Sequence, residues 1–145
     1  MTMLVTGGRI FPSTIVVTPG TKLQFKNSDP FNHRLFISGN QAWRAEDLRG
    51  SGSRDWTAPN GAGRFEFRDE LFPSVRAYVV VEPQVAQFAY PKNDGTFTQN
   101  IAPGEYIVRA YFGGKPVSKP MSITVQGRNM TDMREPLALT ESDAK

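Results

Sequence analysis

Two strands and the loop between them are predicted in the sequence Gly63-Arg-Phe-Glu-Phe-Arg-Asp-Glu-Leu-Phe-Pro-Ser-Val-Arg-Ala-Tyr-Val-Val-Val81. Because side chains alternate along a strand, Phe65, Phe67 and Asp69 share one face of the first strand. A carboxylate at the end of an apolar face is unusual, since a buried charge without a partner is costly. Asp69 is therefore a candidate site residue, and we expect most of the preceding chain to pack against these two strands.

Short strands separated by turn residues are predicted along the rest of the chain. Pro19-Gly20 is a strong turn signal, and the alternation of Leu23 and Phe25 with polar residues places both side chains on an inward face. The expected strands are Met1–Val5, Thr14–Val17, Lys22–Lys26, His33–Ile37, Val85–Tyr90, Thr96–Thr98, Glu105–Phe112 and Met121–Val125. The predicted class is all-β, with the strand spacing of a sandwich.

The hydrophobic periodicity fades over residues 38–62, and a long connection is predicted there. Within it, Gln41–Leu48 is predicted to form a short helical turn with Asn40 as its N-cap. Trp43 and Trp56 also lie in this connection, and we expect their rings to anchor it to the core.

A domain boundary is predicted at Glu82-Pro83. We expect a β-sandwich over residues 1–82, a smaller appended β-module over residues 83–127, and an irregular C-terminal arm over residues 128–145. The arm is polar and interrupted by Pro136, which favours an extended or disordered segment. Its apolar residues have little reason to stay free, so we expect partner contacts from Met130, Met133, Leu137 and Leu139.

The composition argues against several classes of function. The chain has 145 residues, a net charge of +3 and no cysteine, which excludes disulfides, thiolate metal sites and thiol catalysis. Its arginines are interleaved with acidic residues, which favours an ion-paired surface over nucleic-acid binding. No apolar run reaches the ~18 residues of a membrane span. The first residues lack the basic and apolar regions of a signal peptide, so we expect none there.

Residues 10–33 resemble the opening of the cupredoxin family, with the sequence Ile10-Phe-Pro-Ser-Thr-Ile-Val-Val-Thr-Pro-Gly-Thr-Lys-Leu-Gln-Phe-Lys-Asn-Ser-Asp-Pro-Phe-Asn-His33. Such domains often show a Phe-x-Pro strand, a Pro-Gly turn, a hydrophobic strand and an Asn-x-Asp turn before the first copper-ligand histidine. His33 stands in that ligand position. The resemblance covers roughly residues 1–82 and implies a Greek-key β-sandwich.

The other copper ligands of that family come from the loop between the last two strands. Here Asp69 replaces the family's Cys, Phe72 its His and Val75 its Met. A blue-copper site needs a thiolate and two imidazoles, whereas this chain has no Cys and one His. We therefore expect a former metal pocket of His33, Asp69, Phe72 and Val75 that holds no cofactor. In it, Asp69 accepts a hydrogen bond from His33 or Arg68, and Phe72 fills the space.

Residues 86–127 resemble a carboxypeptidase-regulatory-like or transthyretin-like β-module. The matching residues are Asp94-Gly-Thr-Phe97 and Ala102-Pro-Gly-Glu-Tyr106. A cupredoxin-like domain followed by such a segment is similar to bacterial extracytoplasmic proteins, some labelled methylamine-utilisation-like. That resemblance implies a location in the periplasm or at the cell surface.

Catalysis is not expected from this sequence. No serine stands in a nucleophile-elbow context, and nothing brings Glu66, Asp69 and Glu70 together across a cleft. We expect a copper-free structural or protein-binding subunit, whose partner is another protein or a second copy. The alternative is a carbohydrate or small-ligand module that stacks its ligand on Trp43 and Trp56. A third reading is residual copper binding, through His33 with Asp69 or through methionines, as an electron-transfer accessory.

Overall fold

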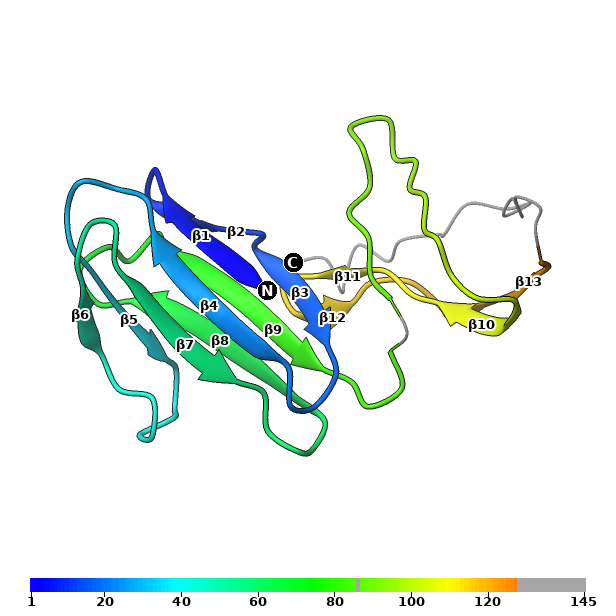
Figure 1. Ribbon diagram of the computed structural model, residues 1–145, viewed down its shortest axis with the longest axis horizontal. Coiled ribbons are helices and arrows are strands. Elements are labelled where there is room, and N and C mark those ends of the chain that lie inside the picture. Colours follow the sequence, from blue (N-terminus) through cyan, green and yellow to red (C-terminus); the bar gives the residue numbers. More distant parts are fainter. Residues whose placement is uncertain (86, 128–145) are drawn as a thin grey trace. The chain divides into compact units, whose positions relative to one another are not determined.

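The computed structural model describes residues 1–85 and 87–127 (Figure 1). The chain forms two compact units, the first spanning Met1–Gln84 and the second beginning at Val85. All regular elements in the described residues are strands, which confirms the all-β class. The arm residues expected to contact a partner, Met130, Met133, Leu137 and Leu139, lie outside the described residues.

The first unit contains two sheets (Figure 1). The four-stranded sheet has the order β2-β1-β4-β7, with β1 at Thr2–Thr6, β2 at Arg9–Phe11, β4 at Lys22–Asn27 and β7 at Ser53–Thr57. The five-stranded sheet has the order β3-β9-β8-β5-β6, with β3 at Thr14–Val17, β5 at His33–Ile37, β6 at Glu46–Leu48, β8 at Gly63–Asp69 and β9 at Arg76–Val81.

The chain passes back and forth between these two sheets. Two pairings, β1 with β4 and β3 with β9, are parallel, and the others are antiparallel. Parallel neighbours require a crossover connection, and here each crossover includes at least one strand of the opposite sheet. The strands predicted at Lys22–Lys26 and His33–Ile37 are confirmed, and Leu23 and Phe25 are fully buried, as their alternation indicates.

Aromatic side chains from both sheets meet in the core between them. The ring of Phe67 on β8 lies 4.6 Å from that of Phe25 on β4 and 5.3 Å from that of Trp56 on β7, measured between centroids. The Trp43 ring lies 5.2 Å from Phe67. Offset and edge-to-face arrangements at these distances stabilise beyond the area that they bury. Phe67 is therefore the centre of the sandwich core.

The helical turn predicted over Gln41–Leu48 is wrong. The Asn40 side chain does accept a hydrogen bond from the Ala42 backbone N–H, 2.9 Å away, but this is the local turn that Asn favours outside helices. The chain then extends into β6, which pairs with β5. The prediction of a long connection over residues 38–62 is also wrong, because this segment contains strands β6 and β7. Trp56 lies on β7, where it is the buried residue.

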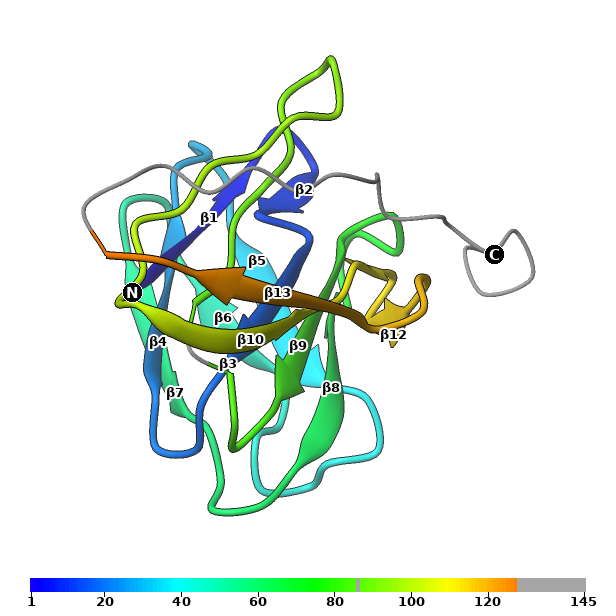
Figure 2. The same cartoon turned by 90° about the vertical axis from the view of Figure 1, so that its right-hand side faces the viewer.

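The second unit contains two small two-stranded sheets (Figure 2). Strand β10 at Gly104–Val108 pairs with β13 at Met121–Val125, and β11 at Tyr111–Phe112 pairs with β12 at Lys115–Pro116. Gly113 and Gly114 form the two-residue turn between β11 and β12, with φ of 59° and 75°. These angles match a tight two-residue turn that glycine adopts without strain.

Three expected strands of the second unit differ in the structure. Residues 87–100 contain no strand, so those predicted at Val85–Tyr90 and Thr96–Thr98 are absent from the described residues. The strand predicted over Glu105–Phe112 is interrupted after Val108. There the Ala110 N–H donates to the Ser118 hydroxyl rather than to a neighbouring strand.

The described residues contain no helix long and apolar enough to cross a membrane.

Replacing Phe67 by alanine should lower the free energy of unfolding of the first unit by about 3–5 kcal/mol. The reason is that its fully buried ring contacts two aromatic side chains of the opposite sheet, Phe25 and Trp56. Urea unfolding followed by the fluorescence of Trp43 and Trp56 measures the change. The matched control is Phe112→Ala, because the Phe112 side chain is 62% exposed and its loss should change stability by less than about 0.5 kcal/mol. Equal effects of the two substitutions would contradict this core.

Candidate functional site

Three buried ionisable side chains, Asp29, His33 and Asp69, form a cluster at one end of the first unit. The Nδ1 atom of His33 lies 2.5 Å from Oδ2 of Asp69. On the other side of the ring, Nε2 lies 2.7 Å from Oδ2 of Asp29. The imidazole is therefore held between two carboxylates. We call these three residues the polar cluster.

The alternation of side chains along the strands places the polar cluster. Inward positions on β4 continue past its end, so that Asn27 and Asp29 are buried in phase with Leu23 and Phe25. His33 is the first residue of β5, and Asp69 is the last residue of β8, opposite Leu35. The arrowheads of β4 and β8 lie at the same end of the unit (Figure 1). The polar residues thus close one end of the apolar core.

A glycine hairpin satisfies the remaining oxygen of Asp29. Gly7 and Gly8 connect β1 to β2 with φ of 59° and 75°, a tight-turn geometry that requires positive φ. The turn places the Gly7 N–H 2.9 Å from Oδ1 of Asp29. Besides joining the two strands, the turn therefore delivers a backbone donor to the buried carboxylate.

Backbone donors also satisfy the remaining oxygen of Asp69. Its Oδ1 atom accepts hydrogen bonds from the N–H of Arg34 at 3.0 Å and from the N–H of Leu71 at 2.8 Å. Each oxygen of the carboxylate therefore has at least one partner. Because Leu71 lies in the loop after β8, this bond also fixes the start of the loop that carries Phe72.

The loop that carries Asp29 is held by a buried asparagine. The Asn27 amide donates to the carbonyls of Phe31 at 2.8 Å and Leu48 at 2.9 Å, and its oxygen accepts from the Asp29 N–H at 2.9 Å. Gly50 approaches so closely that a Cβ atom there would lie 2.8 Å from the Asp29 carbonyl oxygen. Only glycine fits at that position. The loop that carries Asp29 is therefore held by the Asn27 side chain and packed closely against Gly50.

The electrostatics of the polar cluster follow from these bonds. The Gly7 N–H is the main cause that lowers the pKa of Asp29, burial opposes it, and the hydrogen bond and charge of His33 lower it further. Asp29 is therefore a carboxylate, and Oδ1 of Asp69 accepts from two backbone N–H groups. Each ring nitrogen of His33 lies at hydrogen-bond distance from an oxygen of one aspartate. A hydrogen bond to each of two ionised carboxylates needs a hydrogen on each ring nitrogen.

Aromatic rings cover the outer side of His33. The Phe72 ring lies 5.0 Å from the imidazole and the Phe31 ring 5.3 Å from it, and the two phenyl rings are 5.2 Å apart. Phe72 is half-buried, and Val75 is fully buried. His33, Asp69 and Phe72 of the expected former metal pocket therefore lie together, and the Val75 N–H donates to the Phe72 carbonyl. The hydrogen bond to Asp69 involves His33 rather than Arg68.

The donor chemistry of the polar cluster does not suit a metal. A histidine binds a metal through a nitrogen lone pair, and both nitrogens of His33 face carboxylate oxygens at hydrogen-bond distance. Within residues 1–85 and 87–127, no three His, Cys, Asp or Glu side chains are arranged to hold a metal ion. The cluster can hold a charge in place, but it presents no free ligand atom or nucleophile to the outside.

The two tryptophans do not form an open stacking surface. Trp56 is 7% exposed, which contradicts its expected part in ligand stacking, because its strand points the ring into the core. The guanidinium of Arg54 lies 3.5 Å from the centroid of the Trp43 ring, and the Trp43 indole N–H donates to the Asp55 carbonyl. Trp43 is thus held by its neighbours, as expected of an anchor.

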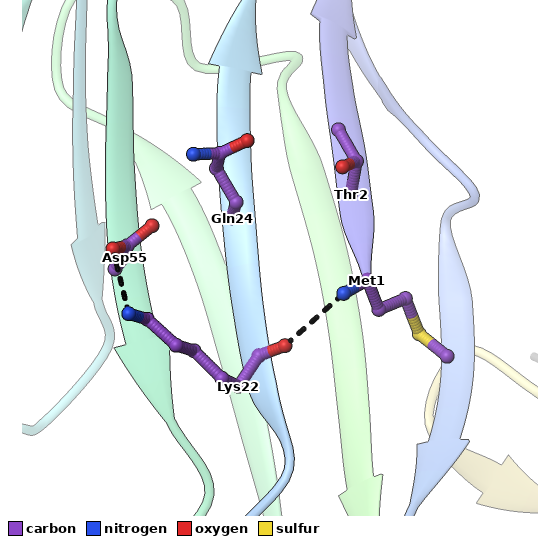
Figure 3. A pocket seen from close by; sticks show the side chains of 5 residues that line it. All are labelled: Met1, Thr2, Lys22, Gln24 and Asp55. Carbon is purple, nitrogen blue, oxygen red and sulfur yellow. Dashed lines mark hydrogen bonds and ion pairs between the residues drawn. The ribbon is translucent and has the colours of Figure 1, made fainter.

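A hollow lies on the four-stranded sheet and is lined by Met1, Thr2, Lys22, Gln24 and Asp55. Figure 3 shows the Lys22 ammonium turned toward the Asp55 carboxylate, 3.3 Å away. Both side chains are largely exposed, and an exposed ion pair of this kind contributes little. The hollow is open, and its lining contains no arrangement of groups suited to catalysis.

Sequence reasoning missed Asp29 and Asn27 as members of the site, since both were assigned only to a turn. The signal was present in the period-two pattern of β4, which continues through residues 23, 25, 27 and 29. Extending that pattern past the strand predicts two inward polar side chains next to His33.

The stability contributed by Asp29 should depend on pH. Its pKa in the folded protein is lowered, so its contribution is fully present above the unfolded value of about 3.9 and is lost as the pH falls through the folded value. Replacing Asp29 by asparagine should cost about 3 kcal/mol of unfolding free energy near neutral pH, and this cost should shrink in acid. Urea unfolding of both proteins at a series of pH values measures it.

The matched control for this prediction is Asp47→Asn. Asp47 accepts a hydrogen bond from Arg34 at 2.8 Å, but its side chain is 56% exposed, so its replacement should cost less than about 1 kcal/mol. An Asp29→Asn cost that stayed constant down to the most acidic pH at which the protein folds would contradict the account.

Comparison with known proteins identifies the fold. No protein-family model matches the sequence, and no curated protein matches it. Among solved structures, amicyanin from Paracoccus versutus is similar at 15% identity and a TM-score of 0.50, over 57% of this chain and 80% of amicyanin. A reduced amicyanin mutant is similar at 14% identity and a TM-score of 0.51, over 57% of this chain and 81% of that one.

A Cu-containing nitrite reductase from Thermus scotoductus is similar at 16% identity and a TM-score of 0.51, over 59% of this chain and 23% of that chain. Identities this low show the fold and nothing finer. The resemblance of the second part to a carboxypeptidase-regulatory-like module stays a prediction. The fold that the first resemblance implied is confirmed, and the chain contains a cupredoxin-like β-sandwich.

Proposed function

We propose that this chain acts outside the cytoplasm as a copper-free, non-catalytic subunit with a structural or protein-binding role. The observation that carries the proposal is the position of His33, whose two ring nitrogens both face carboxylates. A copper ligand needs a free nitrogen lone pair, and blue-copper chemistry also needs a thiolate. The chain has one histidine and no cysteine, so no other residues replace that ligand set.

Exposed apolar residues in the two loops that adjoin the polar cluster support a protein-binding role. Phe31 is 43% exposed and Leu71 is 42% exposed, and the half-buried Phe72 ring lies 5.2 Å from the Phe31 ring. We call these three residues the apical patch. Exposed apolar groups that cluster in this way are typical of interaction sites, and aromatic anchors often dominate the energy of an interface.

The polar cluster and Asn27 make the apical patch suitable for binding, because together they hold the two loops of the patch in place. Asn27 donates to the Phe31 carbonyl, and Asp69 accepts from the Leu71 N–H. A surface that is already ordered loses little conformational entropy when a partner binds. The charge of the buried cluster would then serve to fix a binding surface rather than to hold an ion.

The absence of catalysis and the location are parts of the same proposal. The polar cluster is buried beneath aromatic rings, so it offers no acid, base or nucleophile to a substrate. The extracytoplasmic location and the carboxypeptidase-regulatory-like identity of the second unit rest on the sequence resemblance. Carbohydrate binding has no observation in its favour, because Trp56 is buried and Arg54 covers Trp43.

A protein partner that docks on the apical patch should depend on Leu71. We expect Leu71→Asp to reduce capture of such a partner at least about tenfold, because a carboxylate in the patch would have to be desolvated at the interface. Wild type and variant are immobilised, incubated with an extract of the native host, and compared by quantitative mass spectrometry of the retained proteins.

The matched control is Leu4→Asp, which makes the same change at a leucine that is 38% exposed on strand β1. Urea unfolding of both variants verifies that they are folded. A host protein retained by wild type and by Leu4→Asp, but lost with Leu71→Asp, supports the proposal. If every retained protein binds all three baits equally, the apical patch is not a docking surface.

A further inference from the structure

The β10–β13 ribbon of the second unit is an incomplete sheet. Its two strands pair only with each other in the part of the chain that the structure describes (Figure 2). A two-stranded sheet is marginally stable by itself and normally gains further strands. The apolar side chains on one of its faces are only partly buried, and they are Tyr106, Val108, Met121, Ile123 and Val125.

Exposed residues alternate along the opposite face of β10, and the pattern continues to Arg109, the residue after its end. Glu105, Ile107 and Arg109 are all exposed, and Ile107 is 61% exposed. Among the described residues, neither Glu105 nor Arg109 forms an ion pair. Natural proteins tend to protect edge strands against pairing with another chain. An exposed isoleucine in the middle of an edge strand is therefore unusual.

The sequence Glu105-Tyr-Ile-Val-Arg109 is complementary to itself in the antiparallel direction. If two such strands pair with Ile107 opposite Ile107, then Glu105 of each strand faces Arg109 of the other. Opposite charges at directly facing positions stabilise an antiparallel pair, whereas like charges destabilise it. The same register places Tyr106 opposite Val108 on the apolar face.

We propose that two copies of this chain associate through antiparallel pairing of their β10 strands about a two-fold axis at Ile107. The two ribbons then form one four-stranded sheet in the order β13-β10-β10-β13. The interface is isologous, since each copy contributes the same strand. This proposal deepens the protein-binding role proposed above by naming a second copy as one partner, and it uses a surface separate from the apical patch.

The chemistry of the ribbon favours β10 over β13 as the pairing edge. The exposed face of β13 carries Ser122 and Thr124, which have no charge. Self-pairing of β13 about Ile123 would set Ser122 opposite Thr124 without an ion pair. The β10 edge therefore gains two symmetry-related ion pairs that the β13 edge lacks.

A cysteine at the proposed two-fold axis tests the register. Facing Cα atoms in an antiparallel pair are about 4.5–5.5 Å apart, within the range of about 4.4–6.8 Å that a disulfide spans. Because the chain has no cysteine, an Ile107→Cys protein has one thiol. Under mild oxidation it should form a covalent dimer in high yield, while the matched Thr124→Cys protein, on the same face of β13, should stay uncrosslinked.

Charge reversal tests the ion pairs. Glu105→Arg and Arg109→Glu each place like charges opposite each other twice per dimer, so each should raise the dimer dissociation constant at least about tenfold. The double variant restores opposite charges in every facing pair and should recover wild-type association. Sedimentation velocity over a concentration series measures all four proteins, and Trp fluorescence verifies that the first unit is folded.

Three outcomes of these experiments would overturn the proposal. A wild-type chain that stays monomeric at all concentrations, equal crosslinking of the Ile107→Cys and Thr124→Cys proteins, or a double variant no better than the single ones would each exclude the β10 interface. These outcomes leave the test at Leu71 unaffected, so failure here and failure of the proposed function can be told apart.

Discussion

The imidazole of His33, held between the carboxylates of Asp29 and Asp69, is the constraint on which one whole end of the sandwich depends. Removing charged groups from water costs several kcal/mol for each ion, about as much as a good buried pair returns. The cost is tolerable here because the oxygens and nitrogens of the three side chains have partners. The Gly7 turn and the loops after β4 and β8 must therefore take the positions that supply those partners.

The same constraint explains how a cupredoxin-like sandwich can keep a buried polar end whose nitrogens and oxygens satisfy one another. The expected ligand positions are occupied by Asp69, Phe72 and Val75, and two aromatic rings cover His33. A buried charged network contributes little net stability compared with apolar packing. We infer that the role of this network is to fix the positions of the loops that carry the apical patch. The second unit differs, because its β10–β13 ribbon has too few strands to be stable by itself. Association of two copies would supply the missing strands.

The sequence predicts the first unit better than the second for a physical reason. Alternation in Lys22–Lys26 and in residues 65–69 reflects one buried face, and that signal held in both strands. It failed at Trp56, because the single buried side chain of that edge strand leaves too weak a pattern. Asn40 misled, since the same side chain can cap a helix or close a local turn. Residues 87–100 contain turn signals but bury little apolar surface, so propensity alone did not produce strands. The second carboxylate at His33 was missed because the alternation of β4 was not followed past the end of the strand, where it reaches Asp29.

Nitrogen-15 NMR of the imidazole tests the central claim most directly, because the chain has a single histidine and its two ring nitrogens give unambiguous signals. With both carboxylates ionised, the account predicts a hydrogen on each nitrogen, slow exchange of both hydrogens with water, and no change in either signal when excess Zn(II) or Cu(I) is added. A nitrogen without hydrogen that shifts in a saturable way with added metal would show that His33 is still a ligand, and would contradict the account.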